Sequence, residues 1–128
     1  MIVPFDDEAF ARLADDLDSP DLAVDFLTSF TALLDTRIRR IEQSLRDRNR
    51  EELITALLSL RSSSAMVGAC QLHASTTQAL AEGETAAVGP LVRRLQGQAH
   101  LFTQSTADLC GTSAGMSSAP LTRPGEPA

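Results

Sequence analysis

Residues Ala56 to Leu72 read ALLSLRSSSAMVGACQL and contain the most informative structural pattern of the chain. Through it, and just before it, apolar or small side chains recur at steps of three and four residues, the spacing of one face of an α-helix. These side chains are Leu53, Leu57, Leu60, Ser64 and Val67. The pattern predicts a helix that ends near Gly68 and a second helix that begins at about Ala69.

Helical signals continue upstream of this stretch. Asn49 is a capping residue, and Glu52 supplies a partner typical of a capping box. Further back, Ser19 followed by Pro20 predicts the start of a long helix that ends at about Arg48. The apolar stripe of that helix is Ala23, Leu27, Phe30, Leu34, Ile38, Ile41 and Leu45. A shorter helix is expected before it, with Phe10, Leu13 and Leu17 on its apolar side.

Downstream, the helix that begins at Ala69 is expected to end at about Ala81, before Gly83. A last helix carries Leu91, Leu95, Phe102 and Leu109 on one face. Gly89-Pro90 either starts that helix or kinks an earlier first turn near Thr85, and both alternatives stay open. Small residues and prolines dominate residues 111–128, which predicts a disordered tail.

A short helix followed by four longer ones with short connections predicts an all-α domain over residues 1–110. We expect an antiparallel up-down-up-down four-helix bundle with a short extra N-terminal helix. The 43% of hydrophobic residues suffices for a core of this kind.

Composition narrows the function classes. The chain has eleven basic and seventeen acidic residues and therefore a net charge of −6. This negative charge argues against a nucleic-acid partner. No apolar run reaches the roughly 20 residues of a membrane helix, and the N-terminus does not resemble a signal peptide. Cys70 and Cys110 form no CxxC motif, and with His73 and His100 they show no metal-ligand spacing. A cytoplasmic protein without metal or cofactor is expected.

The opening stretch resembles the signature of bacterial histidine phosphotransfer (HPt) domains, which reads Ala-His-x-Leu-Lys-Gly-Ser-x-x-x-x-Gly-Ala-x-x-Leu. When the two are aligned at Leu60 and Gly68, the phosphoacceptor position falls on Leu58. The matching residues are Leu60, Arg61, Ser63, Gly68, Ala69 and Leu72. The chemically serious departures are Leu58 in place of the His and Ser62 in place of a Gly. The resemblance covers about residues 5–109.

The resemblance implies an HPt-like protein of a two-component phosphorelay. Because leucine has no nitrogen to phosphorylate, we expect no catalytic residue and no enzymatic activity, but binding of a response-regulator receiver or histidine-kinase domain. Helical geometry turns Leu58 about 100° away from the inward Leu57. We therefore predict that the partner-binding surface consists of Ile54, Leu58, Arg61 and Ser62, provided that no other helix covers it.

Two alternatives stay open. The first is an active phosphotransfer protein that uses His73 or His100, although neither has the surrounding motif. The second is a helical protein-protein interaction module unrelated to phosphorelays. The sequence is compatible with a monomer or with a homodimer formed through the same surface.

Overall fold

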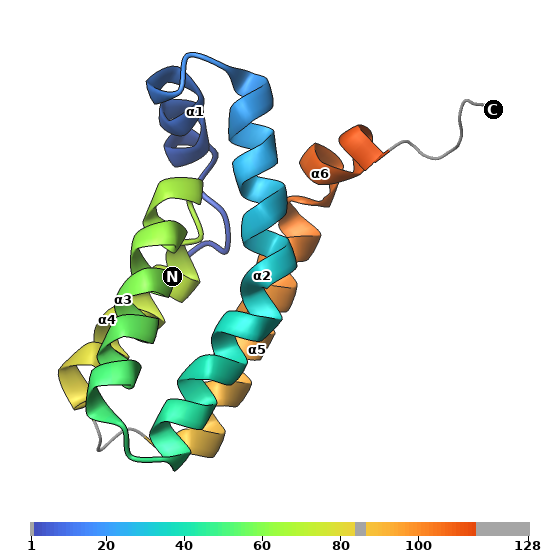
Figure 1. Ribbon diagram of the computed structural model, residues 1–128. Coiled ribbons are helices and arrows are strands. Elements are labelled where there is room, and N and C mark those ends of the chain that lie inside the picture. The colour runs from blue at the N-terminus through green and yellow to red at the C-terminus, as the bar shows by residue number, and fades with distance from the viewer. Residues whose placement is uncertain (1, 84–86, 115–128) are drawn as a thin grey trace.

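The computed structural model describes residues 2–83 and 87–114, and this part of the chain contains six helices and no strand. The predicted all-α class is therefore confirmed. The helices are α1 (Asp7–Asp16), α2 (Pro20–Arg46), α3 (Arg50–Val67), α4 (Cys70–Glu82), α5 (Val88–Ser105) and α6 (Ala107–Ala114). Figure 1 shows α2 along the length of the molecule with α3 and α5 beside it, and α1 near one end.

The long helices begin where their capping residues predict. The Ser19 hydroxyl oxygen accepts a hydrogen bond from the Leu22 N–H at 3.1 Å, and Pro20 occupies the first helical position. The Asn49 side-chain oxygen accepts from the Glu52 N–H, also at 3.1 Å. Both bonds satisfy N–H groups that have no partner inside the helix, so these boundaries follow from local chemistry.

The last helix differs from the prediction. The prediction of a single helix that continues through Leu109 is wrong, because α5 ends at Ser105 and α6 follows as a separate element. At the break, the buried Thr106 donates its hydroxyl to the Phe102 carbonyl oxygen at 2.9 Å. Pro90 lies in the first turn of α5, where a backbone N–H would have no helical partner.

The predicted tail starts at residue 111, whereas helix α6 is described as far as Ala114. The rest of that tail, residues 115–128, lies outside the described residues, as does Thr85. No helix in the described part of the chain is both long enough and apolar enough to cross a membrane.

The core contains every residue of the apolar stripe predicted for α2 and every one predicted for α3. Helix α3 packs between α2 and α4, and α5 packs against both α2 and α4. One predicted position is wrong: Leu17 is exposed, because α1 ends at Asp16 and Leu17 belongs to the turn that follows. An apolar residue one position past the helix end no longer shares the helix face.

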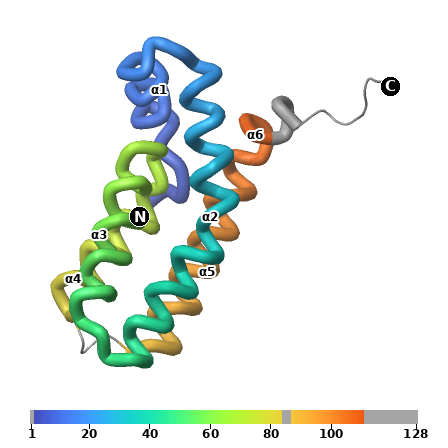
Figure 2. Tube along the Cα trace, in the orientation of Figure 1, coloured from blue at the N-terminus to red at the C-terminus, as the bar shows by residue number. Residues whose placement is uncertain are grey.

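The N-terminal segment before α1 lies over the α3–α4 turn, as the chain trace in Figure 2 shows. The Asp6 N–H donates to the Gly68 carbonyl oxygen at 2.8 Å. The Phe5 ring packs edge-on against Phe102 with centroids 5.7 Å apart, and Phe102 meets Phe30 in the same way at 5.4 Å. These contacts hold the N-terminal segment to the core and fix the end of α3 that carries the opening motif.

Candidate functional site

Leu58, the residue at the phosphoacceptor position of the resemblance, lies at the molecular surface. Its exposed fraction is 42%, and that of Ile54, one turn earlier on α3, is 37%. Leu57 beside it is 1% exposed, so the two neighbouring leucines face opposite environments. Within residues 2–83 and 87–114 no other helix covers Leu58, which leaves an apolar side chain available to a partner.

The other two predicted binding residues lie on the same part of α3. Ser62 is exposed and follows Leu58 by one turn, whereas Arg61 is half-buried. Within the described residues, no hydrogen bond or ion pair engages the Arg61 side chain. Ile54, Leu58 and Ser62 are spaced four residues apart and therefore share one helix face. We call Ile54, Leu58, Arg61 and Ser62 the α3 patch.

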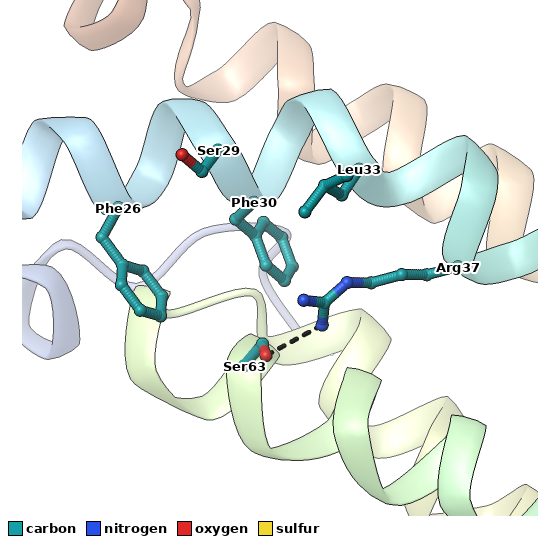
Figure 3. A pocket seen from close by; sticks show the side chains of 6 residues that line it. All are labelled: Phe26, Ser29, Phe30, Leu33, Arg37 and Ser63. Atoms are coloured by element: carbon teal, nitrogen blue, oxygen red, sulfur yellow. Dashed lines mark hydrogen bonds between the residues drawn. The ribbon is translucent and has the colours of Figure 1, made fainter.

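A second group of polar residues lies beside the α3 patch, toward α2. The Arg37 guanidinium of α2 donates from Nη1 to the Ser63 hydroxyl oxygen at 3.0 Å and to that of Ser59 at 3.4 Å. Figure 3 shows Arg37 reaching from α2 toward Ser63 across a pocket. The pocket has a volume of about 90 Å³ and is lined by Phe26, Ser29, Phe30, Leu33, Arg37 and Ser63.

Arg37 was not among the predicted site residues. Ser63 lies 26 positions from it in sequence, so only the packing of α2 against α3 brings the two together. One signal was present in the sequence: the positions three and four residues from Arg37 hold Leu33, Leu34, Arg40 and Ile41, and none of them is an acid. An arginine without an acidic neighbour on its own helix is left available for groups on another helix.

The two histidines occupy different surroundings. His100 is exposed on α5. His73 is half-buried on α4 and lines a pocket of about 220 Å³, together with Arg12 and Asp6 from the N-terminal part of the chain. His73 therefore shares its pocket with one cation, which would attract a phosphoryl group, and with one carboxylate, which would repel it.

Cys70 and Ser64 line the same pocket as His73. Burial raises the pKa of the Cys70 thiol, and the nearby Asp6 carboxylate raises it further, so the thiol is not activated as a nucleophile. The Ser64 hydroxyl is fully buried and has no hydrogen-bond partner among the described residues. Neither group provides the activated nucleophile that covalent chemistry requires.

The described residues contain no cluster of His, Cys, Asp or Glu side chains able to hold a metal ion. Comparison with known proteins adds no relative: no protein-family model, no curated protein and no solved structure matches the chain. The interpretation of the site therefore depends on its residues and their geometry.

Proposed function

We propose that this chain is an HPt-like protein of a two-component phosphorelay that binds a receiver or histidine-kinase domain without transferring a phosphoryl group. In this proposal α2, α3, α4 and α5 form the antiparallel up-down-up-down four-helix bundle of that family, and α1 is the extra N-terminal helix. The protein is cytoplasmic and is not an enzyme.

The exposure of Leu58 is the observation that carries the proposal. A leucine that had replaced a histidine for packing reasons would be buried, whereas Leu58 keeps 42% of its surface in contact with solvent. Apolar side chains that are exposed in the free protein and become covered by the partner commonly form the centre of an interface. Ile54 extends the apolar area along the helix.

Arg61 provides the polar side of the α3 patch. It stands where the family has a lysine that helps neutralise the phosphoryl group, and it has no acidic partner within the described part of the chain. A cation beside an apolar contact favours an acidic partner surface and accelerates its association. Recognition of a partner is therefore retained in this proposal, while the nucleophile needed for chemistry is missing.

The test is the affinity of the full chain for a panel of purified receiver and histidine-kinase domains from the same organism, measured by isothermal titration calorimetry. Leu58→Glu places a charge in the centre of the α3 patch and should weaken binding about tenfold or more, as hot-spot substitutions do. Leu101→Glu is the matched control, because Leu101 is exposed to 45% on α5. It should leave the affinity within about twofold.

The proposal fails if no domain of the panel binds, or if Leu58→Glu and Leu101→Glu have equal effects. Light scattering of the free chain separates a homodimer from a heterologous complex: a dimer that Leu58→Glu dissociates would assign the α3 patch to self-association.

A second candidate function is supported by the pocket that His73 and Arg12 both line. In this alternative the His73 imidazole accepts the phosphoryl group from a receiver aspartyl phosphate. Incubation with a ³²P-labelled receiver distinguishes the two. Acid-labile label on the wild-type chain that His73→Gln removes and His100→Gln retains would establish transfer, and an unlabelled chain supports binding alone.

A further inference from the structure

The side chain of Arg37 lies in a setting rich in hydrogen-bond donors. Its Nη1 donates to the hydroxyl oxygens of Ser59 and Ser63. Because both hydroxyls act as acceptors toward Arg37, their own protons remain available for donation. Among the described residues no acceptor engages those two protons, nor the N–H groups at Nε and Nη2 of Arg37.

Among the described residues no acidic side chain pairs with Arg37, in contrast to two other arginines of α2. Arg40 pairs with Glu52 at 2.8 Å, and Arg46 pairs with Glu42 at 2.8 Å. The pocket around Arg37 is lined only by aromatic, aliphatic and hydroxyl side chains besides the guanidinium itself. A half-buried guanidinium with neutral acceptors only is electrostatically complementary to an anion.

The size of the pocket limits the kind of molecule that can present the anion. Its volume is about 90 Å³. Sites for small-molecule ligands usually measure about 300–1,000 Å³. The pocket therefore fits the tip of one side chain, and the ring of Phe26 and the exposed Leu33 provide apolar contacts at its edge.

We propose that Arg37, Ser59 and Ser63 form an anion site in the groove between α2 and α3 that receives a side-chain carboxylate of the docking partner. This inference rests on the proposed function, because the anion site adjoins the α3 patch: Ser59 follows Leu58, and Ser63 follows Ser62. The docking surface then extends from α3 across the groove to α2. The partner is a protein surface that presents an acidic residue beside an apolar one.

The first test examines the anion site without a partner. The Nε–Hε signals of the arginines are followed by ¹⁵N NMR while the full chain is titrated with sodium acetate, against sodium chloride at equal ionic strength. Arg37 should shift with acetate more than Arg39, which is exposed on the same helix. Equal responses of Arg37 and Arg39 would overturn the anion site.

The second test examines the partner. Arg37→Gln should weaken binding of a receiver domain about tenfold, the usual effect of losing a charge-assisted hydrogen bond, whereas Arg39→Gln removes the same charge and should change it less than about twofold. Arg37→Lys should also weaken binding, because an ammonium cannot replace the planar fork of donors. Thermal unfolding of each variant checks that the fold is intact.

The outcomes separate the two proposals. Equal effects of Arg37→Gln and Arg39→Gln on a complex that does form would overturn the inference and leave the proposed function standing. If no receiver or kinase domain binds the wild-type chain, the proposed function and the assigned partner both fail. The acetate titration then still decides whether Arg37 lies in an anion site.

Discussion

The backbone N–H of Asp6 donates to the carbonyl oxygen of Gly68 at 2.8 Å, so the N-terminal segment is bonded directly to the turn between α3 and α4. Gly68 has a φ of 80°, in the left-handed region, where glycine is favoured. A Cβ at this position would overlap the Asp6 carbonyl oxygen. The glycine of the opening motif therefore permits both the turn and the close approach of the N-terminal segment.

Gly68→Ala should strongly destabilise the fold. The left-handed conformation alone costs a residue with a Cβ about 1–2 kcal/mol, and the backbone of Asp6 must also move away. We expect a loss of at least about 2 kcal/mol in the free energy of unfolding, measured by urea denaturation followed by circular dichroism.

Gly97→Ala provides the matched control for that variant. Gly97 lies inside α5, and a Cβ there would contact nothing within 4 Å. Alanine should stabilise the helix by roughly 0.5–1 kcal/mol. If Gly68→Ala were as stable as the wild type, the contact between Asp6 and Gly68 would not constrain the turn.

Restoring the missing residues of the motif should restore a phosphoacceptor. In the double variant Leu58→His/Ser62→Gly, the imidazole replaces a side chain that is 42% exposed, one turn from a glycine and beside Arg61. We expect acid-labile ³²P on this variant after incubation with a phosphorylated receiver that binds the wild-type chain, and none on the wild type.

The control for this gain of function is Leu101→His, which places an imidazole at a similarly exposed position on α5. It should remain unlabelled, because α5 carries no docking surface in the proposal. Label on both histidine variants would indicate nonspecific phosphorylation. Absence of label on the double variant, in a receiver complex that still forms, would argue against an HPt-like docking geometry.

Cys70 should react slowly with alkylating reagents. Burial and the Asp6 carboxylate raise the pKa of its thiol, so at pH 8 a smaller share is present as the reactive thiolate than in a free cysteine. Asp6→Asn removes the negative charge, lowers the pKa and should speed alkylation by iodoacetamide. Asparagine caps a helix about as well as aspartate, so α1 should remain capped.

The rate is read by mass spectrometry of the Cys70 peptide in a Cys110→Ser background. It should rise with pH and reach its plateau at a higher pH in wild type than in Asp6→Asn. An Asp6→Asn variant that reacts at the wild-type rate at every pH would contradict the electrostatic influence of Asp6 on Cys70.

The candidate site was predictable only along one helix. The spacing that places Leu57 inward also places Leu58 outward, so one residue of the α3 patch follows from the periodicity of α3 alone. Arg37 could not be found in this way, because its contact with Ser63 spans 26 positions and depends on how α2 packs against α3. The break at Thr106 was missed since nothing in the local pattern of α5 is incompatible with a continuous helix.

The helical class, the starts of α2 and α3 and their buried stripes could all be predicted from the order of residues. These depend on hydrogen bonds and spacings within a few residues, which the order of the chain specifies directly. The exposure of Leu58, the contact of Arg37 with the serines of α3 and the bond between Asp6 and Gly68 depend on tertiary packing. Those relationships require separate segments to be packed together, and packing is a property of the whole core rather than of any one stretch.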